Sequence, residues 1–264
     1  IMMVYLGYKL GKENTDQEDY FLAGRKMHWA PVGLSIAATM ISANGFVGGP
    51  GWAYNSGMAA FMMVSVVPLV MFFVSYLFLP FLYNLRVTSV YEYLGKRLGP
   101  ISRSFIAISA IVGGLILVSA MIFTPSYVIQ TFTGWKLGMI IPVVVLVAIV
   151  YTLMGGLKAV IWSDAIQAFV LWGGLIFTII YIISNLDIGF FEAFGQARDL
   201  GKLKAIDFST NLGAESIWIA LIGYGAMWLQ YFISDQSQVQ RMFSSKSIKS
   251  MKQSFVLSSI QMSV

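Results

Sequence analysis

Cysteine is absent from this chain, charged residues are scarce and histidine occurs only once. Without cysteine there is no disulfide framework, no thiolate nucleophile and no cysteine metal site. Only 11% of the 264 residues are charged whereas 58% are hydrophobic, which is too much apolar surface for a soluble fold of this length. Several apolar runs of about 20 residues predict membrane-spanning helices. We therefore expect an all-α protein that spans a lipid bilayer several times.

The motifs of common enzyme and nucleotide sites are missing as well. The apolar runs contain no paired acids, no HExxH pattern and no phosphate-binding loop of the GxxxxGKS or GxxxxGKT type. Gly48, Gly49 and Gly51 follow no predicted strand, so they do not indicate a dinucleotide site. The net charge of +5 is dispersed over short connectors, which argues against a nucleic-acid partner. We expect no enzyme activity and no organic cofactor, and we interpret His28 as an ordinary interfacial residue.

Hydropathy divides the chain into spans and connectors. The chain opens and ends inside apolar runs, so we expect its first and last helices to be parts of longer ones. Thirteen basic residues fall in connectors on one side and four on the other, which by the positive-inside rule places the N-terminus and the 187–215 loop outside the cell. The predicted spans are 29–52, 58–83, 104–131, 137–151, 162–183 and 217–233, with another beginning beyond Ser254.

The first of these spans has an unusual composition. From Leu34 it reads LSIAATMISANGFVGGPGWAYNSG, in which glycine and an interior proline weaken a continuous helix. An interruption at membrane depth would free main-chain carbonyls for a cation. Close helix packing through small residues explains the same composition equally well. The sequence leaves both interpretations open.

The stretch GGLKAVIWSDAIQ, residues 155–167, places Asp164 at the mouth of a long apolar run. A carboxylate at the edge of the hydrocarbon costs free energy, so its presence indicates a functional site. Pairing with Lys158 or capping of its helix would also explain it. Apart from Asp164 and Glu215, no acid or base lies within the spans, which disfavours a proton relay. Sodium fits better, because carbonyl and hydroxyl oxygens bind it with little formal charge, and the segment from Ala38 to Ser42 offers both.

Five stretches carry a family resemblance. In chain order they are DYFLAGRKMHW (19–29), LSIAATMISANGFVG (34–48), LRVTSVYEYLGKRLG (85–99), GGLKAVIWSDAIQ (155–167) and QSQVQR (236–241). Together they resemble the sodium/solute symporter family, which includes the sodium/glucose cotransporters. The resemblance implies a LeuT-type fold of two inverted five-helix repeats, with sodium and substrate near the midplane, where the first helix of each repeat is unwound.

The resemblance also implies how one transmembrane domain is divided. Residues 1–28 would be a truncated leading helix and cytoplasmic loop, and 29–184 the first five-helix repeat. Residues 185–216 would form an extracellular loop, and 217–264 the start of the second repeat. The rest of the second repeat, including the eighth core helix, is not in this sequence.

Individual site residues follow from the same resemblance. The family's sodium site takes main-chain carbonyls at positions matching Ala38 and Ile41, and its other ligands come from the eighth core helix. Asp164 matches the acid at the intracellular sodium exit, and Tyr231 matches the tyrosine that closes the sugar pocket from the cytoplasm. Arg25 matches a loop position near the inner opening, where an ordinary interfacial charge is an equal explanation. The predicted substrate-binding residues are Ser42, Asn44, Gly45, Trp228, Gln230 and Tyr231.

Departures from the sugar-transporting pattern bear on the substrate. Sugar carriers have Gln at the position of Gly45, an acid at Val64 and Asn at Trp228, and an unmade buried hydrogen bond costs about 1–3 kcal/mol. Hexose is therefore disfavoured. The runs DQSQVQR and SVYEYL resemble the branch that carries small organic anions, vitamins and iodide.

We predict a sodium-coupled symporter that imports a small organic solute by alternating access, with a monocarboxylate or similar anion as the leading substrate class. A sugar, an amino acid or another polar solute remains an alternative, as does a channel or sensor built on the same fold. Sodium is the expected coupling ion, and the expected partners are the small-molecule substrate and the lipid of a plasma or bacterial inner membrane.

Overall fold

The computed structural model describes residues 2–208 and 216–263, without the side chains of Ala43 and Asn44. Within these ranges the chain forms helices and two isolated β-bridges, so the predicted all-α class is confirmed. The α-helices are α1 (Met2–Gly11), α2 (Gln17–Leu22), α3 (Trp29–Met40), α4 (Ala43–Ser56), α5 (Met62–Ser65), α6 (Val67–Phe73), α7 (Leu79–Asn84), α8 (Val90–Leu98), α9 (Pro100–Thr133), α10 (Leu137–Ser184), α11 (Phe190–Asp199), α12 (Gly225–Ser234), α13 (Gln236–Phe243) and α14 (Ile248–Ser263). Short 3-10 turns, Ala23–Arg25 and Gly57–Phe61, and π-helical turns, Val74–Phe78 and Ile219–Tyr224, adjoin them.

The predicted spans all coincide with helices. Three helical stretches, Gly45–Asn84, Pro100–Thr133 and Leu137–Ser184, are long and apolar enough to cross a membrane, and Trp29–Met40 and Ile219–Ser234 are shorter apolar helices. The last helix begins at Ile248, earlier than predicted. Large apolar side chains along α9 are exposed, including Ile116 at 70%, which is tolerable only where lipid surrounds the helix. The chain is a multi-pass membrane protein.

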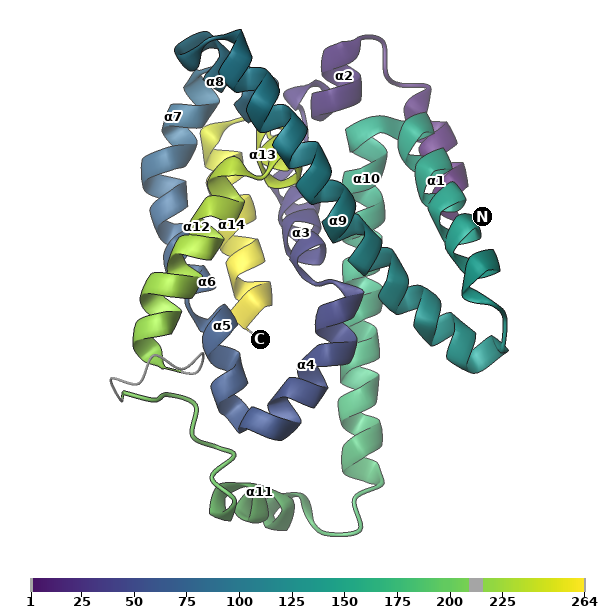
Figure 1. Ribbon diagram of the computed structural model, residues 1–264, viewed down its shortest axis with the longest axis vertical. Helices are drawn as coiled ribbons and strands as arrows, with labels where there is room; N and C mark the ends of the chain where they lie inside the picture. Colours follow the sequence, from purple (N-terminus) through teal and green to yellow (C-terminus); the bar gives the residue numbers. More distant parts are fainter. Residues whose placement is uncertain (1, 209–215, 264) are drawn as a thin grey trace.

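The helices form two groups with an interrupted pair between them. Figure 1 shows α6, α12 and α14 together on one side, α1 and α10 on the other, and α3 and α4 in between. The short helices α2, α8 and α13 gather at one end of the molecule, and α11 lies at the other end. The buried core lies between α3, α6, α12 and α14, where the Phe232 and Phe255 ring centroids are 5.5 Å apart. The short helices therefore cover the ends of the spans.

The first predicted span is broken, as one of the two interpretations proposed. Helix α3 ends at Met40, Ile41 is extended with φ −86° and ψ 100°, and α4 begins at Ala43. Ser42 caps α4, because its Oγ accepts a hydrogen bond from the Gly45 N–H at 3.2 Å. Small residues also serve close packing: a Cβ added at Gly33 would lie 2.8 Å from the Ser254 carbonyl oxygen of α14. Interruption and close packing thus occur in the same span, at different residues.

Helix α10 consists of two helices that meet at a sharp turn (Figure 1). Gly156 stands at the turn with φ 60° and ψ −164°, a conformation that is essentially restricted to glycine. Two carbonyls near the turn are hydrogen-bonded by side chains from the N-terminal segment. Tyr20 Oη donates to the Leu153 oxygen at 3.0 Å, and Asn14 Nδ2 donates to the Gly155 oxygen at 3.3 Å. The turn reverses the chain and sets the direction of the helix that carries Asp164.

Replacing Gly156 with Ala should destabilise the protein. A Cβ at this position would lie 2.7 Å from the Tyr20 carbonyl oxygen and would force the residue out of its backbone conformation. The expected loss is about 1–3 kcal/mol, measured as a lower unfolding midpoint in detergent. Gly173→Ala in the same helix is the matched control, because no atom lies within 4 Å of its added Cβ. Equal midpoints for the two variants would contradict the assigned role of the turn.

Candidate functional site

The residues at the interruption between α3 and α4 line a cavity. In the part of the chain that the structure describes, no backbone N–H donates to the carbonyl oxygen of Ala38 or Ile41. Both residues line a cavity of about 690 Å³, together with Ser42, Asp164 and Gln167. A smaller cavity of about 200 Å³ also touches Ala38 and Ile41 on the side of α14. The structure therefore brings together the three residues predicted to bind sodium, although Asp164 lies more than a hundred positions beyond Ala38 and Ile41 in the sequence.

Asp164 is held by two residues from other helices. Its Oδ2 accepts hydrogen bonds from the Ser35 hydroxyl at 2.6 Å and from Arg241 Nη2 at 2.9 Å. Arg241 Nε donates in turn to the Ser35 Oγ at 2.8 Å, so the three side chains form a closed ring of bonds. The Asp164 and Arg241 side chains are only 16% and 9% exposed. This ring joins α3, α10 and α13 beside the cavity.

The ordinary explanations considered for Asp164 do not match this arrangement. Lys158 forms its ion pair with Glu13 of the N-terminal segment rather than with Asp164. Asp164 also does not cap its helix, because the second half of α10 begins after the turn at Gly156, two helical turns before the acid. The partner of Asp164 is Arg241, which the sequence analysis counted only as a connector charge. Glu215, the other acid near a span, lies outside the described residues.

The oxygens around the cavity suit a hard monovalent cation. Both hydrogen bonds to Asp164 converge on Oδ2, and the described residues supply no hydrogen-bond donor to Oδ1. That atom and the carbonyl oxygens of Ala38 and Ile41 are the oxygen ligands that alkali cations accept. The described residues contain no group of three His, Cys, Asp or Glu side chains that could hold a metal ion. The arrangement thus favours an ion held mainly by neutral oxygens.

The predicted substrate residues separate into two places. Ser42 lines the cavity beside Ile41, and Gly45 is exposed one turn further along α4. The Asn44 side chain lies outside the described residues. Trp228 and Tyr231 lie on α12 and do not line the cavity that contains Asp164, and Gln230 is exposed.

Trp228 and Tyr231 are held by bonds to neighbouring elements. The Trp228 indole N–H donates to the Met63 carbonyl oxygen at 2.8 Å, next to Val64. The Trp228 ring stands edge-on to that of Tyr231, with centroids 5.7 Å apart. Gln238 of α13 is fully buried and donates from Nε2 to the Tyr231 hydroxyl at 2.8 Å. Sequence reasoning missed Gln238, although it falls within the QSQVQR stretch.

Helix α13 connects the inner ends of several elements through its polar side chains. Gln236 accepts from the Val90 N–H at 3.2 Å and donates to the Thr88 oxygen, which ties α13 to the start of α8. Gln240 donates to the Phe21 oxygen of α2 at 2.6 Å. Together with the bonds of Gln238 and Arg241, the motif contacts five different parts of the chain: α2, α3, the start of α8, α10 and α12. The QSQVQR stretch is therefore a structural connector between these elements.

Arg25 lies at the same end and makes specific bonds. Its Nε pairs with Glu18 Oε1 at 2.7 Å, and its Nη2 donates to the Val87 oxygen at 3.1 Å. The guanidinium is also 5.7 Å from the centroid of the Phe243 ring. These contacts join the loop after α2 to the loop before α8 and to the end of α13. Arg25 is thus more than a solvated interfacial charge.

Nearby, α8 begins with reciprocal capping bonds. Ser89 Oγ accepts from the Glu92 N–H at 3.1 Å, while the Glu92 carboxylate accepts from the Thr88 N–H at 2.9 Å. The Lys96 ammonium, followed by the Thr88 N–H, lowers the pKa of Glu92 to about 2. Glu92 therefore stays ionised in mildly acidic solution, and its carboxylate continues to cap the start of α8.

Comparison with known proteins places these features in a family. The profile described as the sodium:solute symporter family matches residues 20–264. The sodium-coupled monocarboxylate transporter 2 of Mus musculus is 32% identical over 250 residues, which cover 94% of this chain and 40% of that protein. The sodium/sialic acid symporter of Proteus mirabilis is 29% identical over 259 residues, covering 96% of this chain and 51% of that protein.

A solved structure matches along the whole chain. It is a substrate-bound, outward-open state of a Na⁺-coupled sialic acid symporter, with a TM-score of 0.91 and 27% identity, covering 100% of this chain and 55% of that one. The match confirms the predicted LeuT-type fold, and it confirms that the chain corresponds to the N-terminal portion of that fold. The chain spans about half the length of the curated relatives it matches.

Replacing Arg241, the positively charged member of the buried ion pair with Asp164, should destabilise the protein. In Arg241→Gln, Asp164 remains largely buried without a compensating charge, and the expected destabilisation is about 3–5 kcal/mol, measured by equilibrium unfolding in mixed micelles. Adding Asp164→Asn should recover part of this loss, because no unpaired charge then remains. Arg198→Gln is the control, since its pair with Asp199 is about 75% exposed and should contribute little. A double variant that loses the sum of both single effects would show that the pair is not coupled.

Proposed function

Because the chain belongs to the sodium:solute symporter family, whose members are transporters and not enzymes, we propose that it forms part of a sodium-coupled secondary active symporter that imports a small organic solute. One observation supports this proposal above the others. The helix interruption at Ile41 places Ala38 and Ile41, whose carbonyl oxygens accept no backbone hydrogen bond from the described residues, on the same cavity as Asp164. A continuous helix or a core of apolar side chains would offer a cation nothing at this depth.

Sodium is the proposed coupling ion, bound by the carbonyl oxygens of Ala38 and Ile41. Asp164 lies at the inner end of the same cavity and provides the exit for the ion, with Oδ1 as the atom available to it. The remaining ligands would be hydroxyls of the eighth core helix, which this sequence does not contain. The cavity of about 690 Å³ beside the interruption leaves room for that helix to approach.

A monocarboxylate or a similar small organic anion is the proposed substrate. Two observations support this class. The relatives described above are named as transporters of a monocarboxylate or of sialic acid. In addition, the chain lacks the polar side chains that sugar carriers place at Gly45, Val64 and Trp228. Ser42, Asn44, Gly45, Gln230 and Tyr231 are the proposed contacts, with Trp228 as an apolar wall beside Tyr231. Amino acids and other polar solutes are the next class to consider.

Alternating access supplies the mechanism. Substrate and sodium bind from outside while the inner face is closed by the Asp164–Arg241 pair and by the Gln238–Tyr231 bond. Opening toward the cytoplasm requires both contacts to separate, after which sodium leaves past Asp164. This orientation places the N-terminus and α11 outside and α2, α8 and α13 in the cytoplasm, with residues 29–184 as the first repeat and 217–264 as the start of the second. It follows from the distribution of basic residues in the connectors.

The function is tested by uptake into proteoliposomes that contain the full-length protein. An inward sodium gradient should drive saturable accumulation of a radiolabelled short monocarboxylate, whereas lithium or potassium gradients should not. Sialic acid, an amino acid and a hexose form the comparison panel, and the hexose should accumulate least. Flux that is non-saturable and independent of sodium would indicate a channel instead, and binding without flux would indicate a sensor.

Replacing Asp164 with Asn should reduce sodium-dependent uptake by about tenfold or more and should weaken the apparent sodium affinity, because a charged oxygen is lost from the ion path. Asp187→Asn is the matched control, since Asp187 is an exposed acid at the other end of the molecule. Protein content of the vesicles is measured in parallel to separate transport from folding. Unchanged uptake with unchanged sodium affinity would remove Asp164 from the ion path.

A further inference from the structure

The C-terminal end of α4 is bonded by a residue from the connector that follows α11. Lys202 Nζ donates to the carbonyl oxygens of Tyr54 and Asn55, at 2.9 and 2.6 Å. In a continuing helix the Met58 N–H would donate to the Tyr54 oxygen, but here it donates to the Lys202 carbonyl oxygen at 2.7 Å. The side chain and the main chain of Lys202 therefore satisfy groups that the last turn of α4 cannot satisfy itself.

Gly57 permits this close approach. It follows the last residue of α4 with φ 64° and ψ −149°, which residues with a Cβ rarely adopt. An added Cβ would lie 2.7 Å from the Lys202 Cα. The connector can therefore reach the end of the helix only because a glycine stands there.

The same connector is bonded to the helical stretch that leads into α12. The Ile217 N–H donates to the Asp207 carbonyl oxygen at 2.9 Å. Buried Ser216 begins this stretch, and its Oγ accepts from the Trp218 N–H at 3.2 Å. Residues 202–207 thus form a strap between the end of α4 and the start of the stretch that continues into α12.

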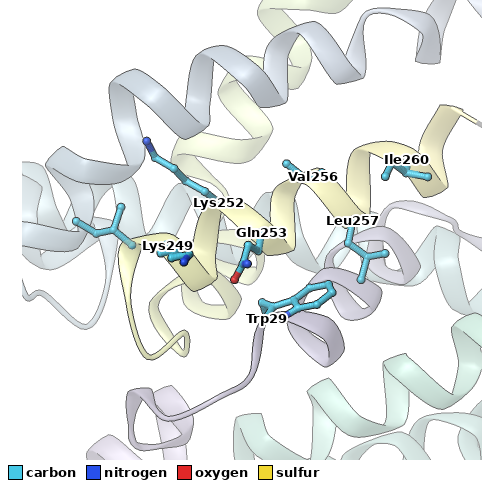
Figure 2. Close-up of a pocket in the computed structure, with 8 residues that line it drawn as sticks. Trp29, Lys249, Lys252, Gln253, Val256, Leu257 and Ile260 are labelled. Atoms are coloured by element: carbon cyan, nitrogen blue, oxygen red, sulfur yellow. The ribbon is translucent and has the colours of Figure 1, made fainter.

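The strap does not depend on an open surface, because both partners of each of its bonds are described residues. A groove of about 600 Å³ along α14 is different in this respect. It is lined by Trp29 and by residues of α14 or just before it (Figure 2). Helix α14 is the last helix of a chain that spans about half the length of its relatives. Its open surface therefore does not show a free binding site.

Helix α4 needs such support at its ends. Four of its 14 residues are glycine, and Pro50 in its interior has no backbone N–H to donate. The helix rises about 21 Å from the interruption to the strap. Ser42 caps its first end and Lys202 bonds its last carbonyls. Because the interior is weak, these two ends set the direction of the helix.

We propose that the strap couples the two spans that carry the proposed substrate contacts, and that Lys202 is a positioning residue for α4. This rests on the proposed function, in which Ser42 and Gly45 belong to one span and Trp228 and Tyr231 to the other. Because the strap bonds both spans at the α11 end, the two spans move together when the substrate binds. Without the strap every contact remains present but is misaligned, which weakens substrate affinity without removing a ligand.

Hydrogen exchange of the full-length protein, measured by mass spectrometry, tests the coupling without sodium or substrate. In Lys202→Met the Met58 amide should exchange about fivefold or more faster, because its acceptor is no longer held. The Ile217 amide, at the far end of the strap, should also exchange faster. Lys136→Met removes an exposed lysine from another connector and should change neither amide. Faster exchange at Met58 alone, at neither amide, or equally in every helix would overturn the coupling.

Uptake kinetics in proteoliposomes test the positioning role with a radiolabelled short monocarboxylate. Lys202→Met should raise KM about threefold or more and change kcat less than about twofold, because no ligand of ion or substrate is removed. Lys202→Arg should restore KM, since a guanidinium can donate to the same two carbonyl oxygens. A lower kcat at unchanged KM, or no rescue by arginine, would overturn this role. Wild-type protein without sodium-driven uptake would instead contradict the proposed function, and the exchange result would be unaffected.

Discussion

The buried ring of Ser35, Asp164 and Arg241 is the interaction on which the packing of α3, α10 and α13 depends. A carboxylate and a guanidinium removed from water lose several kcal/mol of hydration each, and only close, well-directed hydrogen bonds offset that cost. Here the ring links α3, α10 and α13, which lie far apart in sequence. Because neither charge is stable alone at this depth, the three helices hold one another in place.

The irregular backbone of the protein is arranged around this ring. Ile41 interrupts the α3–α4 span two helical turns beyond Ser35, and Gly156 reverses α10 two turns before Asp164. At the Gly156 turn, nearby carbonyls are satisfied by Tyr20 and Asn14, so this break is structural. At Ile41 the residues of the break line a cavity instead, and no described backbone N–H donates to the carbonyl oxygens of Ala38 or Ile41, which gives this break a different chemical character. The contrast separates a turn that only shapes the chain from one that offers ligands.

In the proposed cycle, closure toward the cytoplasm and binding of the ion share residues. Asp164 contributes one oxygen to the ring and has a second that is free of donors among the described residues, so the same carboxylate can respond to an ion and hold α13. Helix α13 also holds Tyr231 through Gln238. In the proposed symport cycle, this shared helix is the physical link between the ion path and the substrate side.

The amino-acid sequence alone determined the membrane class, the spans, the weak point near Ile41 and the family, because hydropathy, glycine content and local motifs are carried by neighbouring residues. It also indicated Ala38, Ile41 and Asp164, which the structure places on one cavity. It did not determine the partner of Asp164. Lys158 is near in sequence but pairs with Glu13, while Arg241 lies 77 residues away. Composition also left interruption and close packing undecided, since glycine serves both. Those choices were made by the tertiary structure, because only folding decides which buried charges meet and which backbone oxygens remain without a donor.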